Sequence, residues 1–177
     1  MRHLLKSLIE RNPALAMSLR SYRHWSALQR QLPTLTPYGF HLMGHAAMQN
    51  GQFEPEETAI VQNFLDEITV FIDVGANVGF YACLARAAGK QTVAIEPLTA
   101  NLDYLYANLQ ANGWNDVEVI PCGLARQPGT AVLYDSGTGA SLVSGWAGTP
   151  ATLRHTIPPV HTRHRIRRPI CRTQAAD

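Results

Sequence analysis

Two acidic side chains and a glycine-rich loop form the part of this sequence best suited to chemistry. The apolar run 70–74 contains Asp73, and Gly75 and Gly79 follow it at G-x-x-x-G spacing. A second apolar run ends at Glu96, about 20 residues beyond the loop, which is the separation expected for a carboxylate that binds ribose hydroxyls. A strand, a glycine turn, a helix and a second strand in this order predict a nucleotide-cofactor site.

The glycine spacing favours one cofactor over another. A dinucleotide fingerprint requires G-x-G-x-x-G at the start of the helix, and this loop lacks it. The loop therefore favours S-adenosylmethionine, while an NAD-linked oxidoreductase stays a weaker alternative because Glu96 also suits the ribose of NAD. A plain structural alternative is that the glycines only close a turn and Glu96 is a solvated charge.

The segment 73–79 (Asp-Val-Gly-Ala-Asn-Val-Gly), with Glu96-Pro97, Asn108 and Asn112-Gly113, resembles the FkbM-type methyltransferases. The lead-in segments 37–40 and 51–54 share this resemblance, which extends over residues 37–145. It implies a Rossmann-like class I methyltransferase that uses S-adenosylmethionine, commonly to methylate a hydroxyl of a sugar, polysaccharide or natural product. The cofactor-binding residues that it implies are Asp73, Gly75, Ala76, Asn77, Gly79, Glu96 and Pro97.

The resemblance also implies a role for each part of the site. Asp73 is expected near the methionine amino group or a water that bridges to it, Asn77 among the polar contacts of the loop, and Glu96 at the ribose diol, with Pro97 fixing the turn beyond it. Because Glu96 ends a strand, we expect its removal to weaken binding and to leave the fold nearly unchanged. No catalytic base can be named, since methyl transfer from a sulfonium depends mainly on in-line positioning of donor and acceptor.

Composition places the chain among globular proteins, with 46% hydrophobic and 16% charged residues. No apolar run approaches the roughly 20 residues that cross a bilayer, so we expect no transmembrane segment. Cys83, Cys122 and Cys171 are odd in number and widely spaced, which suits a reducing cytoplasm. The histidine pairs, 41 with 45 and 161 with 164, lack a third ligand at useful spacing, so no metal site is expected.

We expect three parts: a helical segment over 1–36, a partial Rossmann-like α/β domain over 37–148, and a tail over 149–177. The first part is basic and amphipathic, and a packed surface helix is favoured there over a targeting peptide or a membrane-surface helix. The second part is expected to contain these elements: a helix after Glu54 with Ile60, Val61, Phe64 and Leu65 on its core face, a strand over 70–74 covered on both faces, a helix ending at Gly89, a strand over 92–96, a helix capped by Thr99 and ending at Asn112, and strands near 117–121 and 130–134. The first three strands should lie in the spatial order third, second, first.

The tail differs in charge from the rest of the chain. It has six arginines and one acidic residue, a net of +5, which leaves nine basic and 12 acidic residues, a net of −3, for 1–148. A nucleic-acid-binding arm is disfavoured because the tail lacks Phe, Tyr and Trp for stacking on bases. We expect a disordered tail or one translated out of frame.

The resemblance implies a further strand with an Ile-Asp-Val-Glu-Gly-like motif beyond Ser141-Leu142, and this sequence lacks it. We therefore expect the sheet to be truncated after its first half. The alternative to an active methyltransferase is then an inactive, truncated or frameshifted fragment of one.

Overall fold

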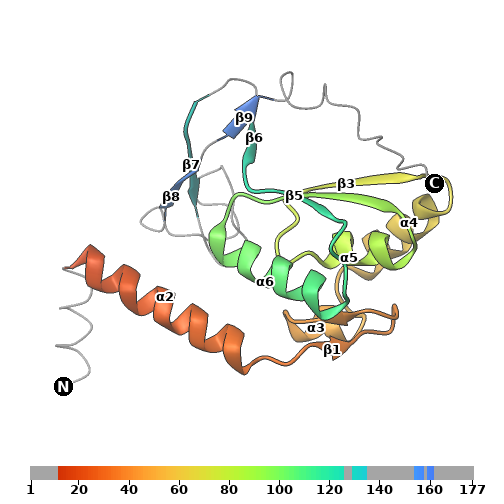
Figure 1. Cartoon of the computed structure of the whole chain (residues 1–177), viewed down its shortest axis with the longest axis horizontal. Coiled ribbons are helices and arrows are strands. Elements are labelled where there is room, and N and C mark those ends of the chain that lie inside the picture. Colours follow the sequence, from red (N-terminus) through yellow and green to blue (C-terminus); the bar gives the residue numbers. More distant parts are fainter. Residues whose placement is uncertain (1–11, 126–128, 135–153, 158, 162–177) are drawn as a thin grey trace, which may run out of the picture.

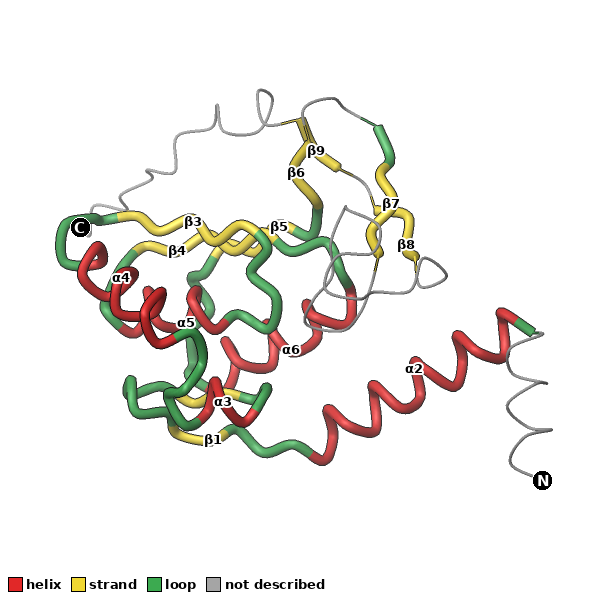
Figure 2. The backbone as a smooth tube through the Cα atoms, turned by 180° about the vertical axis from the view of Figure 1, so that it is seen from behind, coloured by secondary structure: helices red, strands yellow, loops and turns green. Residues whose placement is uncertain are grey.

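The computed structural model describes residues 12–125, 129–134, 154–157 and 159–161. Figure 1 shows one helix, α2, extending away from a body that holds the other elements, and Figure 2 shows the same from behind. None of the described helices combines the length and the apolar character needed to span a bilayer. In chain order the elements are α2 (Pro13–Arg30), β1 (Thr34–Leu35), β2 (His41–Leu42), α3 (Ala46–Gln49), α4 (Pro55–Leu65), β3 (Val70–Val74), α5 (Phe80–Ala87), β4 (Gln91–Ile95), α6 (Thr99–Ala111), β5 (Glu118–Ile120), β6 (Gly123–Ala125), β7 (Ala131–Tyr134), β8 (Arg154–Ile157) and β9 (Pro159–His161).

A parallel three-stranded sheet forms the centre of the body. Its order is β3-β4-β5, with Val74 opposite Ile95 and Ile95 opposite Ile120. Helices α5 and α6 make the two connections between these strands. The predicted order of the first three strands is confirmed, and the mixed α/β arrangement is compatible with half of a Rossmann-like fold.

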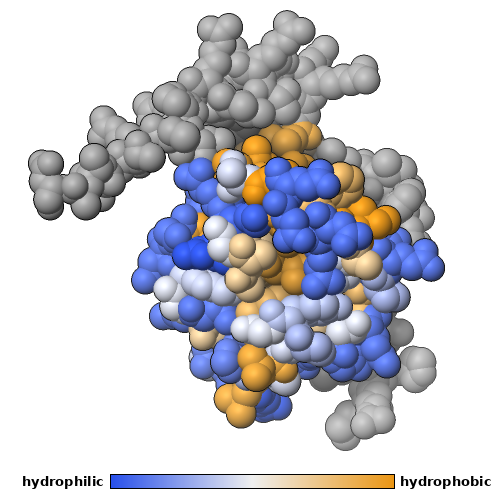
Figure 3. All heavy atoms as spheres, turned by 90° about the vertical axis from the view of Figure 1, so that its right-hand side faces the viewer, coloured by the Kyte–Doolittle hydropathy of each residue, from blue (hydrophilic) through white to orange (hydrophobic). Residues whose placement is uncertain are grey.

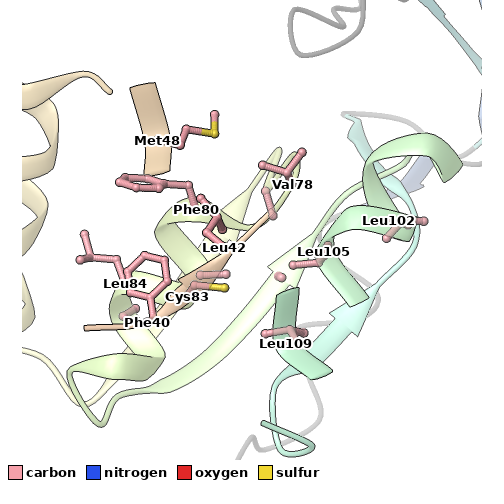
Figure 4. Packing of buried hydrophobic residues seen from close by; sticks show 14 of the residues in the cluster. Phe40, Leu42, Met48, Val78, Phe80, Cys83, Leu84, Leu102, Leu105 and Leu109 are labelled. Carbon is pink, nitrogen blue, oxygen red and sulfur yellow. The ribbon is translucent and has the colours of Figure 1, made fainter. Parts of the chain in front are cut away.

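Helices α5 and α6 lie on the same side of this sheet and enclose the main core (Figure 2). Phe40 and Leu42 from the β2 region, Phe80 from α5 and Leu105 from α6 are fully or almost fully buried in it (Figure 4). Burying one such side chain contributes roughly 1.5–3 kcal/mol. Val78 belongs to the same cluster, so the glycine loop is anchored directly to the core.

The other side of the sheet is less covered. Ile72 and Val74 are exposed, and Val74 retains 60% of its accessible surface. The apolar run of β3 suits a strand covered on both faces, but among the described residues no helix lies on this side and β3 pairs with β4 alone, which agrees with the expected truncation of the sheet. On α4, Leu65 is buried as predicted, but Ile60 and Phe64 are exposed. Figure 3, seen from the α4 side of the body, shows hydrophobic residues at the surface among hydrophilic ones.

Two asparagines four residues apart attach α6 to β2. The Asn108 Nδ2 atom donates to the carbonyls of Met43 at 2.9 Å and Val78 at 2.8 Å, and its Oδ1 accepts the Met43 N–H. The Asn112 amide forms the same kind of pair with the backbone of His41, at 2.8 and 2.7 Å. Residues i and i+4 share a helix face, so the two side-chain amides lie side by side. They bond to the backbone at residues 41 and 43 as the backbone of a neighbouring strand would.

Parts of the tail also form strands. β8 pairs antiparallel with β7, and β9 pairs parallel with β6. Ile157 at the end of β8 is buried with Leu98 and Leu133. Residues 154–157 and 159–161 thus differ from the disordered tail expected from composition, because they find strand partners and an apolar contact that composition does not reveal. The rest of the tail, residues 1–11 and the segment around Ser141 lie outside the described residues.

Candidate functional site

The glycine loop, residues 75–79, joins the carboxyl end of β3 to α5. Gly75, Asn77 and Gly79 have φ of +79°, +53° and +88°, the left-handed region that glycine adopts without steric cost. A Cβ added at Gly75 would meet no atom within 4 Å, whereas one added at Gly79 would collide with Cδ1 of Leu105. Gly79 is therefore needed for packing against α6, while Gly75 leaves open space at the end of the strand.

The backbone N–H groups of the loop bond to the chain itself. The first two loop residues donate to the Ile95 carbonyl at 2.8 and 3.1 Å, and Asn77 donates to Oε2 of Glu96 at 2.9 Å. Gly79 donates to the carbonyl three residues before it at 2.7 Å. A phosphate-binding loop directs its N–H groups toward the ligand, and these four point into the loop and the end of β4 instead.

Asp73 lies next to the end of β3, opposite Ala94 of β4. Its carboxylate accepts a hydrogen bond from the Ala82 N–H in the first turn of α5. Its Oδ2 atom is buried and has no hydrogen-bond partner within the part of the chain that is described. Burial raises the pKa of Asp73 to about 6, the Ala82 bond lowers it, and the nearby Glu96 charge adds a further increase. A buried acceptor of this kind is stabilised by any ligand that brings a donor or a positive charge.

Glu96 follows β4 directly and retains only 4% of its accessible surface. Its Oε1 accepts bonds from the Leu98 N–H at 2.9 Å and from Nδ2 of Asn101 at 3.2 Å, and its Oε2 accepts the Asn77 N–H. An ionised carboxylate offers about four lone-pair positions, so one is left, on Oε2. One position on Oε2 is thus left for a ribose hydroxyl, and the expected role of Glu96 at the ribose diol stays a prediction.

Pro97 lies partly buried in the turn between Glu96 and α6. The expected N-cap role of Thr99 is wrong by one residue, because Leu98 is the N-cap and Thr99 already begins the helix. Glu96 accepts the cap N–H instead.

Asn101 contributes a hydrogen bond to Glu96 that was not predicted from the sequence. The signal was present, because this asparagine lies in the first helical turn, five residues after a glutamate at a strand end.

Two aromatic residues near the loop pack on the core, as expected from the sequence. The Tyr81 ring packs against Phe80 and Phe53, and its hydroxyl donates to Oε2 of Glu54 at 2.8 Å. Trp114 packs against Phe40. Both rings are partly buried against the main core. Cys83 is buried on α5. This burial raises the pKa of its thiol to about 12, so the cysteine stays protonated at neutral pH.

All seven residues expected in the site lie in two adjacent segments, 73–79 and 96–97, which the bonds of Ile95 and Glu96 hold together. The result is a pair of carboxylates at the ends of neighbouring parallel strands, beside a loop with an open position at Gly75. Among the described residues, no group of three His, Cys, Asp or Glu side chains is placed to hold a metal ion.

Comparison with known protein families finds no match, and comparison with solved structures finds none either. A protein of Methanocaldococcus jannaschii described only as uncharacterized is 33% identical over 60 residues. These residues make up 34% of this chain and 23% of that protein, so the match spans less than a quarter of the relative. The description of that relative gives no activity, so the similarity indicates none for this chain.

Proposed function

We propose that this chain carries the cofactor-binding half of an S-adenosylmethionine-dependent methyltransferase of FkbM type. The acceptor in this proposal is a hydroxyl of a sugar, polysaccharide or natural product, presented as a small molecule or glycan. The observation that carries the proposal is the pair Asp73 and Glu96 at adjacent strand ends, beside a loop whose N–H groups are already bonded.

The charge of the site supports this cofactor over NAD. The pyrophosphate of NAD is an anion, which two neighbouring carboxylates repel and which the internally bonded N–H groups of the loop do not cradle. S-adenosylmethionine brings a sulfonium and an ammonium group, and both are attracted by carboxylates. Charge-assisted hydrogen bonds of this kind contribute roughly 1.5–3 kcal/mol each.

Each side chain then has one task. Asp73 Oδ2 accepts a bond from the methionine ammonium group, and Oε2 of Glu96 accepts one ribose hydroxyl. The open position at Gly75 leaves room for the cofactor to approach the backbone. The sulfonium itself supplies the methyl group, and catalysis by this half of the site consists of fixing its direction.

The exposed side of β3 favours a second candidate, an inactive fragment. Parallel sheets are normally buried on both faces, and here Ile72 and Val74 are exposed. A fragment of this kind would bind the cofactor poorly and expose apolar surface. Strong binding of a hydrophobic dye together with non-cooperative thermal unfolding would favour it, and a sharp unfolding transition without dye binding would remove it.

Thermal unfolding of the full chain with S-adenosylmethionine, S-adenosylhomocysteine or NAD tests the proposal. A ligand at 100 times its Kd stabilises the folded state by about 2.7 kcal/mol, which raises the midpoint by several degrees in a chain of this size. We expect the two adenosyl ligands to raise the midpoint and NAD to leave it unchanged. A larger shift with NAD, or no shift with any ligand in a cooperatively folding protein, would contradict the proposal.

A further inference from the structure

The N-terminal quarter of the chain has a one-sided charge. The helix α2 contains Arg20, Arg23 and Arg30 and no acidic residue, and the segment 11–53 as a whole contains no Asp or Glu. Twelve of the 13 acidic residues of the chain lie at position 54 or later. A helix that is only solvated normally carries charges of both signs, so this segregation favours a negatively charged partner.

The same helix exposes large apolar side chains. Leu19, Tyr22 and Trp25 follow one another at i, i+3 and i+6, and Tyr22 and Trp25 retain 63% and 57% of their accessible surface. Their ring centroids lie 6.2 Å apart. Leu32, just beyond the end of the helix, is 79% exposed. The packing expected from the sequence is thus not found for these described side chains, and Figures 1 and 2 both show α2 extending away from the body.

We propose that α2 lies in the surface of a membrane that contains anionic phospholipid. Trp and Tyr side chains suit the headgroup level, where an apolar ring and a polar atom are both accommodated, and Leu19 and Leu32 reach toward the acyl chains. Arg23 and Arg30, seven residues apart on one helix side, pair with lipid phosphates. Basic residues near an anionic lipid surface are attracted to it electrostatically.

Lipid fits these observations better than nucleic acid. Arginines and aromatic rings also bind single-stranded nucleic acid. The exposed leucines at both ends of the aromatic pair, however, make no favourable contact with phosphates or bases. A bilayer surface uses the leucines, the rings and the arginines together. This inference does not depend on the proposed methyltransferase activity.

The test is sedimentation of the full chain with vesicles of phosphatidylcholine alone and with vesicles that also contain phosphatidylserine. We expect binding to the second kind only, weakening as salt is raised, with a blue shift of tryptophan emission. W25S and Y22S together should weaken binding at least about tenfold, a loss of about 1.4 kcal/mol. R23Q with R30Q should weaken it to a similar extent.

Phe64→Ser is the matched control, because Phe64 is also a helical aromatic residue, 59% exposed, but lies on α4. It should bind vesicles as the unchanged protein does. Absence of binding to phosphatidylserine vesicles by the folded protein would overturn the proposal, and so would equal losses for Phe64→Ser and Trp25→Ser. Tighter binding to an oligouridylate than to vesicles, lost in the α2 variants, would overturn it in favour of a nucleic acid.

Discussion

The carboxylate of Glu96 accepts the backbone N–H of Asn77 at 2.9 Å, and this bond ties the end of β4 to the glycine loop after β3. The two residues are 19 positions apart in the chain. Together with the Ile95 carbonyl, which accepts the first two N–H groups of the loop, the bond fixes the loop before any ligand arrives. Glu96 therefore has a structural task in addition to any contact with a cofactor.

Glu96→Ala is expected to lower the free energy of unfolding by about 2–4 kcal/mol. The change leaves the Asn77 and Leu98 N–H groups and the Asn101 amide without their acceptor, and each buried unpaired donor costs about 1–3 kcal/mol. This replaces the expectation from the sequence that the fold stays nearly unchanged. Urea denaturation measures this loss, with Glu118→Ala as the control, because Glu118 is an exposed residue of β5. Equal stability of both variants would show that the bonds around Glu96 are dispensable.

Asp73→Asn should stabilise the unliganded protein at neutral pH. The pKa of Asp73 in the fold is about 6, above its ordinary value of 3.8, so the carboxylate lowers stability progressively as pH rises from about 4 to about 6. Two pKa units correspond to about 3 kcal/mol, an upper bound on the gain from removing the charge. The unfolding midpoint of the variant should exceed that of the unchanged protein near pH 7.5 and match it near pH 4. A gain independent of pH would exclude the charge as its cause.

The two loop glycines should respond differently to substitution. Gly75→Ala meets open space and should cost only about 1–2 kcal/mol for its positive φ, whereas Gly79→Ala adds a collision with Leu105. In Gly79→Ala with Leu105→Ala, the two losses of stability should be less than additive because the smaller side chain at position 105 relieves the collision.

Gly75→Val should fold but lose cofactor binding, since its side chain fills the space left for the ligand. Normal binding by Gly75→Val would show that no ligand approaches the loop there.

Ile157→Ala tests whether the tail belongs to the fold. Its side chain is buried with Leu98 and Leu133, so truncation should cost about 2–4 kcal/mol. Val132→Ala on the partner strand β7 is the control, because Val132 is exposed. An unchanged free energy of unfolding in Ile157→Ala would mean that the tail is disordered in solution, as the composition alone suggested.

The sequence predicted those parts of the fold that depend on local pattern. The apolar runs before Asp73 and Glu96, the glycines after Asp73 and the helical spacing of Leu102, Leu105 and Leu109 led to the correct strands, helices and strand order. Properties set by distant partners were not predictable in this way. The exposure of Ile60 and Phe64 depends on what covers α4, and the strand pairing of β8 depends on a partner more than 15 residues away.

The same division holds within the site. The position of Glu96 followed from spacing, but its three hydrogen bonds depend on how the loop and the first turn of α6 fold back on it. Asn101 has no motif of its own and was missed. The pKa of Asp73 likewise depends on burial beneath α5, which no pattern in the strand reveals.

Calorimetric titration of the full chain with S-adenosylmethionine, at about pH 7.5 and about pH 5.5, tests the central claim most directly. A cation bound at Asp73 favours its ionised form, so affinity should rise as pH increases through about 6, with a proton released on binding near that pH. Asp73→Asn should abolish this dependence and most of the affinity, and NAD should give no heat. Binding that is independent of pH and unaffected in Asp73→Asn, or no binding by a cooperatively folded protein, would contradict the account.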